Sequence, residues 1–318
     1  MISGETILLT GGAGFIGSHL VEALLPHNHL HVFDTFRRHP VESHPLRDHD
    51  NVTFFQGDVR DMDGLRNASN GVTRVLHLAS VAGVSTVLNN PSLTMNVAIQ
   101  GTTNILELAR ENPSIKRVIT YSTSEVFGSH ALNVTENDPT PLGPVSESRW
   151  TYAASKIASE HLAMSYGREF GVPAVSLRPF NVYGPGQVGE GAIHNFIARA
   201  IRNEPIIVNN DGRQIRSWCY VSDMVDGTLR ALESEQSVGE AFNIGNPQAT
   251  ITVVRLAELI VRLAGSSSKI EYRKRDYPDV EVRLPNIDKA REYLAFEPRV
   301  SMEDGIARTI AWYREQLT

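Results

Sequence analysis

The stretch Thr10-Gly11-Gly12-Ala13-Gly14-Phe15-Ile16-Gly17 lies between a short apolar run at residues 7–9 and an amphipathic segment that begins at Phe15. Glycines at these positions permit a tight turn, a close approach of backbone N–H groups to a phosphate, and close packing of a following helix on the strand. The N-terminus of that helix adds partial positive charge at the same point. The stretch therefore predicts a strand, a phosphate-binding turn and a helix, in that order.

An acidic residue ends the next apolar run. Asp34 comes 20 residues after Gly14, a spacing typical of the carboxylate that hydrogen-bonds the ribose diol of a dinucleotide. A carboxylate there would repel a 2′-phosphate, so we expect NAD rather than NADP as the cofactor. Arg37 and Arg38 lie close enough to keep NADP as an alternative.

The first half of the chain alternates between two patterns. Runs rich in β-branched residues predict buried strands at residues 7–9, 30–33, 52–55, 75–78, 118–121 and 174–177. Amphipathic patterns predict helices at residues 15–25, 93–110 and 152–170. Strand and helix in alternation indicate an α/β fold with a doubly wound parallel sheet of the Rossmann type.

The rhythm changes after Pro179. A loop rich in glycine and proline at residues 181–191 precedes predicted helices at residues 193–202, 221–232, 254–263 and 301–316. We therefore expect an NAD-binding domain in residues 1–180. Residues 181–318 should form a smaller α+β lobe that binds the substrate and is interleaved with the first domain.

Composition excludes several classes of protein. The chain has 318 residues, of which 21% are charged, and a net charge of −6, which gives no support to a nucleic-acid partner. No stretch approaches ~20 uninterrupted apolar residues, so no membrane span is expected. The N-terminal segment lacks the basic region of a secretory signal, and the single Cys219 cannot form an internal disulfide. These features predict a cytoplasmic protein without a metal site, in which Cys219 is a small buried side chain.

A tyrosine and a lysine stand four residues apart, which is about one helical turn. Tyr152 and Lys156 stand at positions i and i+4 of the predicted helix at residues 152–170, and so share one face. A neighbouring Lys⁺ and the positive nicotinamide would lower the pKa of the tyrosine toward neutrality, so that it can take a proton from a substrate hydroxyl as hydride leaves. The segment 121–128 follows the preceding strand, at the edge of the sheet that faces the cofactor.

Five motifs together resemble the extended short-chain dehydrogenase/reductase family over nearly the whole chain. They are Gly-Gly-Ala-Gly-Phe-Ile-Gly at 11–17, His-Leu-Ala-Ser at 77–80, Ser-Thr-Ser-Glu-Val-Phe-Gly at 122–128, Tyr-x-x-x-Lys at 152–156 and Arg-Pro-Phe-Asn-Val-Tyr-Gly-Pro at 178–185. Members act on nucleotide-diphosphate sugars with a retained NAD and pass through a 4-keto intermediate. The resemblance implies that Thr123 binds the 4-hydroxyl, that Tyr152 is the base and that Lys156 supports it.

The residues after Thr123 bear on the reaction. Glu125 matches the base of 4,6-dehydratases, whose pattern is Thr-Asp-Glu, but Ser124 replaces the aspartate. Thr-Ser-Glu is typical of UDP-glucuronate decarboxylases, and Arg149 in Arg-Trp-Thr-Tyr resembles a decarboxylase motif. We therefore expect a UDP-glucuronate decarboxylase. The first alternative is a 4,6-dehydratase, because some amino-sugar dehydratases also carry Thr-Ser-Glu. The second is a 4-epimerase.

A non-catalytic NAD-sensing regulator is a reading of a different class. Such proteins typically lose the Tyr/Lys pair, which this chain retains.

The resemblance also implies the binding residues. Catalytic roles are expected for Thr123, Ser124, Glu125, Tyr152 and Lys156, and substrate contacts for Thr123, Arg149, Asn181, Arg216 and Arg283. Arg216 and Asn181 match diphosphate-binding positions, and Arg283, in Arg-Leu-Pro-Asn-Ile, is the candidate for a sugar carboxylate. Expected cofactor contacts are Gly11, Gly14, Phe15, Ile16, Gly17, Asp34, Asp58, Val59, Leu78, Ala79, Ser80, Tyr152, Lys156, Pro179, Asn181 and Val182.

Three further expectations concern packing. The family's usual asparagine falls at Ala98, so Asn96 is not assigned that role, and His77 is expected in the core. Arg213 and Arg275 lie in segments on the presumed ligand side of the second lobe, where Arg213 has an equal prospect of being a solvated surface residue. The apolar stripes of the two long helices at 93–110 and 152–170 predict a homodimer through a four-helix interface.

Overall fold

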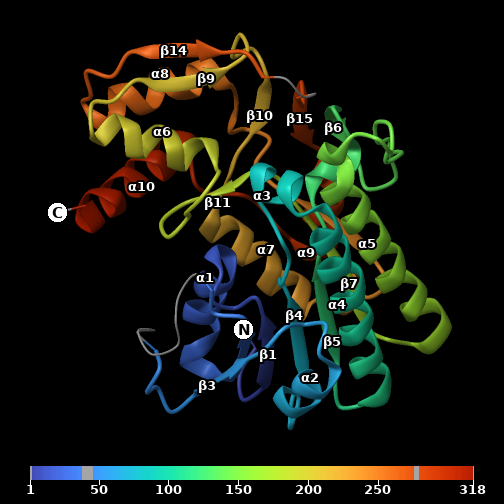
Figure 1. Ribbon diagram of the computed structural model, residues 1–318. Coiled ribbons are helices and arrows are strands. Elements are labelled where there is room, and N and C mark those ends of the chain that lie inside the picture. Colours follow the sequence, from blue (N-terminus) through green and yellow to red (C-terminus); the bar gives the residue numbers. More distant parts are fainter. Residues whose placement is uncertain (1, 38–45, 276–278, 318) are drawn as a thin grey trace.

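The centre of the computed structural model, which describes residues 2–37, 46–275 and 279–317, is a parallel sheet in the order β12-β7-β5-β4-β1-β2-β3 (Figure 1). Its strands are β1 (Thr6–Thr10), β2 (His29–Asp34), β3 (Val52–Gln56), β4 (Arg74–His77), β5 (Arg117–Tyr121), β7 (Ala174–Pro179) and β12 (Ala241–Ile244). The strand order reverses between β1 and β4. The predicted doubly wound α/β fold is therefore confirmed.

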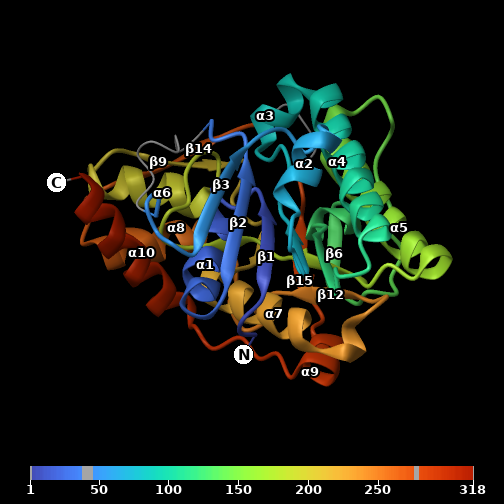
Figure 2. The same ribbon diagram turned by 90° about the horizontal axis from the view of Figure 1, so that it is seen from below.

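Helices cover both faces of this sheet, which explains why its strands are apolar throughout (Figure 2). Side chains alternate along β1, so Ile7 and Leu9 enter one core and Leu8 the other, and all three are 0% exposed. The core around Ile7 is covered by α1 (Phe15–Leu24), α7 (Val221–Glu233) and α9 (Asp288–Leu294). The core around Leu8 is covered by α2 (Met62–Ala68), α4 (Pro91–Glu111) and α5 (Thr151–Phe170).

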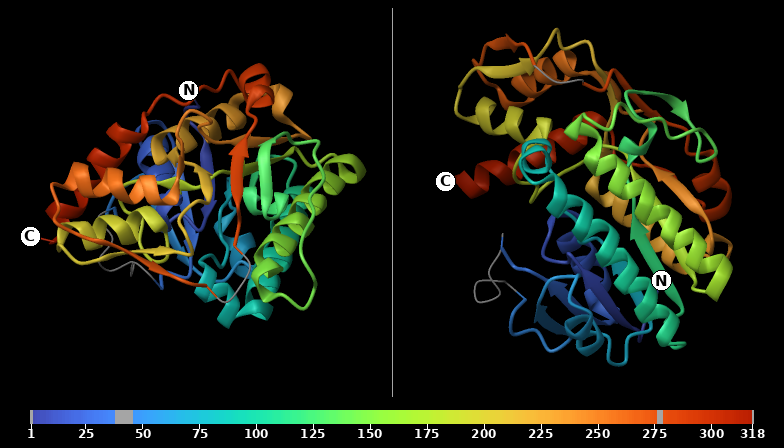
Figure 3. Two further views of the ribbon diagram at one scale, coloured as in Figure 1. Left: turned by 90° about the horizontal axis from the view of Figure 1, so that it is seen from above. Right: turned by 45° about the vertical axis from the view of Figure 1, so that its right-hand side comes forward.

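A second group of helices surrounds its own core. It consists of α6 (Ala192–Ile201), α8 (Val253–Ala264) and α10 (Met302–Leu317), with the parallel pair β9 (Ile206–Asn209) and β14 (Ile270–Arg273). This yellow-to-red lobe lies beyond one end of the large sheet in the right-hand view of Figure 3. The predicted helices α1, α4, α5, α6, α7, α8 and α10 all occur within two residues of their expected bounds. The shorter α2 and α9 were not expected.

The two halves of the chain share their sheets. A four-stranded sheet has the order β13 (Thr250–Thr252), β10 (Ile215–Ser217), β15 (Val282–Pro285) and β6 (His130–Val134). Thus β6 from the first half pairs with β15, while β12 from the second half joins the large sheet. The predicted loop at 181–191 contains a strand, β8 (Val182–Tyr183), which pairs with β11 (Cys219–Tyr220).

Parallel strands bring their carboxyl ends to one edge. There β1, β4, β5 and β7 end at Thr10, His77, Tyr121 and Pro179, beside the point where the strand order reverses, which is where ligands bind in such sheets. A short helix, α3 (Val84–Asn89), follows β4 at this edge, near the second lobe (Figure 1). No helix within the described ranges is long and apolar enough to cross a membrane.

Candidate active site

A cavity of about 490 Å³ opens at this edge, within the range of ~300–1,000 Å³ usual for small-molecule sites. It brings together most of the predicted residues: Gly11, Gly14, Phe15, Ile16, Gly17, Leu78, Ser80, Thr123, Ser124, Glu125, Arg149, Tyr152, Lys156, Pro179, Asn181, Val182 and Arg283. Five predicted residues are not part of its lining, namely Asp34, Asp58, Val59, Ala79 and Arg216.

The glycine turn has the shape that a phosphate needs. Gly11 adopts φ +73°, and a Cβ there would lie 2.7 Å from the backbone nitrogen of Ala79. A Cβ on Gly17 would lie 2.4 Å from the carbonyl oxygen of Gly11. No side chain caps the first turn of α1, so its N–H groups face the cavity as donors to an anion. The turn therefore fits the pyrophosphate of a dinucleotide.

Asp34 lies at the end of β2, against the glycine turn. Its Oδ2 accepts a hydrogen bond from Ala13 N and its Oδ1 from Phe36 N, both at 3.1 Å. Of the alternative cations, Arg37 is exposed and Arg38 lies outside the described residues.

Asp58 and Val59 are occupied by other contacts. Asp58 forms an ion pair with Arg60 at 2.7 Å, and the carbonyl of Val59 accepts a hydrogen bond from Asn104 Nδ2 at 2.9 Å. The expected cofactor roles of Asp58 and Val59 stay predictions.

Tyr152 lies in the first turn of α5, with Lys156 one turn further on. The Lys156 ammonium donates to the carbonyl oxygen of Tyr121 at 2.7 Å and lies 5.9 Å from the centroid of the Tyr152 ring. Burial lowers the pKa of Lys156 to about 8. Burial also raises the pKa of the Tyr152 phenol, the charge of Glu125 raises it further, and the hydroxyls of Thr123 and Ser80 offset part of this.

The expectation that Lys156 and the positive nicotinamide together lower the pKa of Tyr152 stays a prediction, because the chain's own groups act on the phenol here without a nicotinamide. The ammonium is held by the Tyr121 carbonyl rather than by the phenol, so its charge does not outweigh the cost of burying a phenolate. The chain's own groups keep Tyr152 protonated. The positive nicotinamide would add to the electrostatic effect of Lys156 in lowering this pKa.

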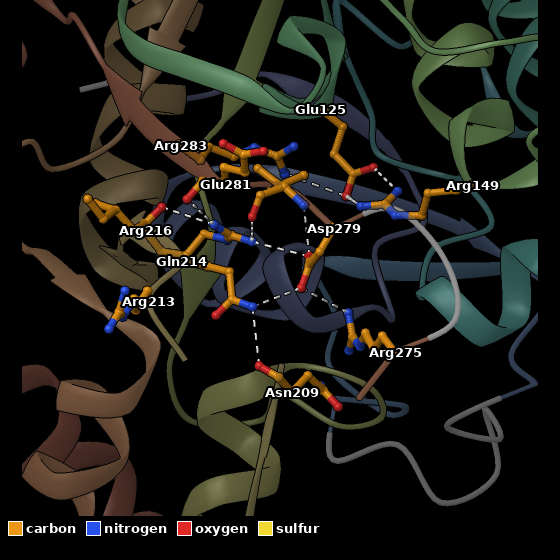
Figure 4. Close-up of polar contacts among 12 residues, drawn as sticks. Glu125, Arg149, Asn209, Arg213, Gln214, Arg216, Arg275, Asp279, Glu281 and Arg283 are labelled. Atoms are coloured by element: carbon orange, nitrogen blue, oxygen red, sulfur yellow. Dashed lines mark hydrogen bonds and ion pairs between the residues drawn. The ribbon is translucent and has the colours of Figure 1, made fainter. Parts of the chain in front are cut away.

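Glu125 is partly buried and lies between two buried arginines, Arg149 and Arg283, with which it forms a charged cluster (Figure 4). Arg149 binds it through two hydrogen bonds, Nη1 to Oε2 at 2.6 Å and Nη2 to Oε1 at 3.2 Å. Arg283 Nη1 lies 3.6 Å from Oε1. Burial by itself would raise the pKa of the Glu125 carboxyl, but Arg283 and Arg149 outweigh it and hold the pKa below its ordinary value. The carboxylate is therefore ionised at neutral pH.

The cluster carries more positive than negative charge. Arg283 is 4% exposed, donates from Nη2 to the carbonyl of Gly128 at 3.3 Å, and its Nε has no hydrogen-bond partner among the described residues. Two guanidinium groups thus share one carboxylate at the cavity wall. Because buried charge is costly unless paired, this corner favours an anionic group of a ligand.

Arg216 is not part of the cavity lining, and its expected contact with a diphosphate stays a prediction. Its Nη2 donates to the carbonyl of Val280 at 2.6 Å and lies 3.4 Å from Asp279 Oδ1 (Figure 4). Burial and the neighbouring Arg283 lower its pKa to about 10. Arg275 also pairs with Asp279, at 3.7 Å, so this partly buried carboxylate is shared by two arginines. Asn181 lines the cavity, and its Nδ2 donates to Ser217 O at 2.8 Å.

Other expectations concern residues outside the chemistry. His77 is 4% exposed, lies between Thr10 Oγ1 (2.7 Å) and Thr102 Oγ1 (3.3 Å), and has its pKa lowered to about 3 by burial. It is therefore a neutral core residue, as expected. Asn96 is exposed, whereas the carbonyl of buried Ala98 accepts a hydrogen bond from Ser159 Oγ at 3.0 Å.

The structure also shows the exposure of Cys219 and Arg213. Cys219 is 0% exposed, and burial raises the pKa of its thiol. The side chain of Arg213 is 86% exposed, which makes it a solvated surface residue. The described residues contain no group of three or more His, Cys, Asp or Glu side chains that could hold a metal ion.

Two lining segments were not predicted. They are residues 82–87, which include the start of α3, and residues 187–191, which lie before α6. The first could have been found from its position directly after β4, at the ligand-binding edge. The second fell within the predicted loop at 181–191, but nothing in the sequence indicates that the two segments meet.

The geometry agrees with the comparisons to known proteins. The family model described as "NAD dependent epimerase/dehydratase family" matches residues 7–245. The chain belongs to this family. As a family member it is an enzyme and its cofactor is NAD.

Two curated relatives and one solved structure are similar over nearly the whole chain. The UDP-N-acetyl-alpha-D-glucosaminuronate decarboxylase of Bacillus cytotoxicus is 35% identical over 97% of each chain. UDP-glucuronic acid decarboxylase 1 of Arabidopsis thaliana is 35% identical over 98% of this chain and 70% of its own length. The UDP-glucuronic acid 4-epimerase of Bacillus cereus, in complex with UDP-glucuronic acid and NAD, has a TM-score of 0.87 at 29% identity and covers 98% of this chain and 99% of that one.

Replacement of Asp34 should weaken the preference of this family member for NAD over NADP. Asp34→Asn keeps an acceptor for Ala13 N but removes the charge that would repel a 2′-phosphate. We expect the ratio of the Kd for NADP to the Kd for NAD to fall by about tenfold, the equivalent of ~1.4 kcal/mol. Calorimetry with both dinucleotides measures it, and Arg37→Gln is the control. Tighter binding of NADP to the unaltered protein would show that a cation such as Arg37 governs the choice.

Proposed function

We propose that the protein is a lyase that decarboxylates UDP-glucuronate through a 4-keto intermediate. One observation carries the proposal: the partly buried Glu125 is shared by Arg149 and Arg283, which leaves surplus positive charge at the cavity wall. In the nucleotide derivative of a neutral hexose only the diphosphate is negatively charged, and the sugar itself has no group that would pair with these arginines. A uronate has a carboxylate on C6, and a guanidinium suits it through charge-assisted hydrogen bonds.

The proposed chemistry assigns each residue a step. NAD, when bound, accepts the hydride from C4. Tyr152 takes the proton from the 4-hydroxyl, Thr123 holds that hydroxyl, and Lys156 supports the phenolate electrostatically. Arg283 holds the C6 carboxylate, and Arg149 keeps Glu125 ionised and fixed beside it. The oxidised sugar is a β-keto acid, so its C5–C6 bond can break with release of carbon dioxide and leave the electron pair at C5 as an enolate. The enolate then takes up a proton at C5, and return of the hydride to C4 would restore NAD. No step needs a group that protonates a leaving hydroxyl.

The names of the relatives support a uronate substrate. Those of Bacillus cytotoxicus and Arabidopsis are named as decarboxylases of UDP-linked uronates. Because the Bacillus relative is named for a 2-acetamido uronate, that sugar is our second candidate substrate. The epimerase named for UDP-glucuronic acid shows why the same fold keeps 4-epimerisation as an alternative. The 4,6-dehydratase reading remains the other one.

Mass spectrometry of the products decides between these reactions. We would incubate the NAD-loaded protein separately with UDP-glucuronate, its 2-acetamido analogue, UDP-N-acetylglucosamine and dTDP-glucose. A product lighter by the mass of carbon dioxide from either uronate supports the proposal. Loss of water from a neutral sugar, without release of carbon dioxide from the uronates, would assign the protein to the dehydratases. An unchanged mass with a changed retention time would indicate epimerisation.

We also propose that the protein is a homodimer through α4 and α5. The two helices pack against each other, and Val97, Leu162 and Met164 on them are only partly buried in the single chain, with Phe170 48% exposed. A second copy could cover these side chains in a four-helix interface. Light scattering at micromolar concentration should give twice the chain mass of 35.1 kDa. A monomer would contradict the proposal.

A further inference from the structure

One carboxylate joins the two lobes across the mouth of the cavity. Glu190, in the loop before α6, accepts hydrogen bonds from Ser85 N at 2.6 Å, Thr86 N at 3.1 Å and Thr86 Oγ1 at 3.0 Å. Its partners lie in the first turn of α3, more than a hundred residues earlier in the chain. Residues 83–87 and 187–191 both line the cavity that contains the glycine turn. The contact therefore closes a ring of chain around the ligand space.

The contact supplies α3 with a cap that its own sequence lacks. The residue before the helix is Gly83, which has no side chain to accept a hydrogen bond from the first turn. Glu190 accepts from two of the N–H groups that would otherwise be unsatisfied. Gly83 has φ +112°, and a Cβ there would lie 3.0 Å from Glu190 Oε1. The backbone at residue 83 is thus shaped to admit this carboxylate.

The rest of the loop that carries Glu190 is anchored elsewhere. The carbonyl of Pro185 is bonded to His19 Nε2 of α1 at 2.9 Å. The carbonyl of Gln187 accepts a hydrogen bond from the hydroxyl of Tyr313 in α10. The side-chain amide of Gln187 donates to the carbonyl of Val182 at 3.1 Å. Glu190 and its partner Ser85 are by contrast exposed. The contact with α3 is therefore the solvent-exposed one of these tethers.

We propose that Glu190 is a positioning residue that clasps residues 83–87 to the second lobe and so closes the cavity over the bound cofactor. Hydrogen bonds to an ionised carboxylate contribute much when they are buried from solvent and little when they are exposed to it. This contact can therefore break and re-form without unfolding either lobe. Burial alone would raise the pKa of Glu190, but the hydrogen bonds from Ser85 and Thr86 hold it below its ordinary value. The clasp is thus charged at neutral pH.

The clasp also bears on the charged cluster. Helix α3 packs against the short helix Ser148–Trp150, which carries Arg149. Arg149 in turn holds Glu125 through two hydrogen bonds. Release of α3 would therefore loosen the support of the residue that fixes Glu125. This link runs through packing, so Glu190 acts on the site without touching the reacting atoms.

The test compares Glu190→Gln and Thr86→Val with Glu292→Gln, which removes the same charge from an exposed position on α9. Stopped-flow displacement of NADH measures cofactor release and does not depend on the identity of the sugar. We expect release about three- to tenfold faster in Glu190→Gln, a smaller effect in Thr86→Val because both backbone donors remain, and no change in the control. Hydrogen exchange of ligand-free protein should show faster exchange of the Ser85 and Thr86 amides in Glu190→Gln.

Each outcome has a definite meaning. Unchanged NADH release together with unchanged exchange at residues 83–87 would overturn the clasp. Faster release with an unchanged melting temperature would distinguish positioning from a general loss of stability. Once a substrate is identified, the same variants should raise KM more than they lower kcat. The failure of every sugar to react would contradict the proposed function but leave both clasp measurements intact.

Discussion

Tyr152→Phe should stop oxidation of the sugar while leaving the cavity almost unchanged. The substitution removes one oxygen from a partly buried side chain, and burial and the charge of Glu125 both raise the pKa of its phenol. Without that oxygen no group in the first turn of α5 can take the 4-hydroxyl proton. Loss of a general base typically lowers the rate by about 10²–10⁴-fold. NADH formation in a single turnover, monitored by absorbance, measures the effect.

The matched control is Tyr166→Phe. Tyr166 lies on the same helix, but its hydroxyl donates to Glu107 Oε1 at 2.5 Å, far from the cavity lining. The control should retain activity, and calorimetry should show that Tyr152→Phe still binds the nucleotide sugar with a similar Kd. A Tyr152→Phe variant that oxidises the sugar within a factor of a few of the unaltered enzyme would remove Tyr152 as the base.

The pH dependence gives an independent reading of the same residue. Because the charge of Glu125 raises the pKa of Tyr152, the phenolate forms at higher pH than it would without that charge. Glu125→Gln should therefore move the rising limb of the oxidation rate to lower pH. A shift to higher pH would contradict this electrostatic coupling.

Arg283→Met should abolish the preference for a uronate. Arg283 is buried, has an unbonded Nε and is the cation in our proposal that binds the C6 carboxylate. Methionine preserves much of the apolar stem and removes the charge. Loss of one partner of a buried charge pair costs ~2–5 kcal/mol. We therefore expect kcat/KM for UDP-glucuronate to fall by about 10²–10³-fold.

The comparison that matters is between charged and neutral sugars. Binding of UDP-glucose, measured by calorimetry, should change little in Arg283→Met, since that ligand has no carboxylate for Arg283 to hold. Arg213→Gln removes an exposed arginine of the same lobe and serves as the control. An equal loss of affinity for both sugars would mean that Arg283 supports the fold or Glu125 rather than the substrate carboxylate.

Much of the site could be predicted because its parts are local in the chain. The glycine turn, Asp34 and the Tyr152/Lys156 pair follow from strand order and helix periodicity, and parallel strands necessarily bring their carboxyl ends to one edge. The structure places Gly11, Thr123, Tyr152 and Lys156 in one cavity accordingly. The bounds of the long helices were also accessible, because apolar residues recur along each of them at helical spacing.

The partners of charged residues could not be predicted in this way. The sequence indicates that Glu125, Arg149, Arg216 and Arg283 belong to a ligand site, but not which of them pair. In the structure Arg149 binds Glu125, whereas Arg216 turns toward Asp279. Ion pairing depends on distances of a few ångströms between segments that are far apart in the chain, and no periodicity encodes those distances. The same holds for Glu190 and α3, which meet across the two lobes.

The sequence by itself thus determined six of the seven strands of the large sheet, the glycine turn and the helix face that carries Tyr152 and Lys156, since each follows from residues that are close together in the chain. It did not predict β12, which joins the sheet from the second half of the chain. Only the tertiary structure decided the protonation of Tyr152, the excess positive charge around Glu125 and the closure of the cavity by Glu190. These properties arise from burial and from the summed field of charges brought together by packing. Burial and the charge of Glu125 raise the pKa of the Tyr152 phenol, whereas two arginines outweigh burial at Glu125 and lower the pKa of its carboxyl.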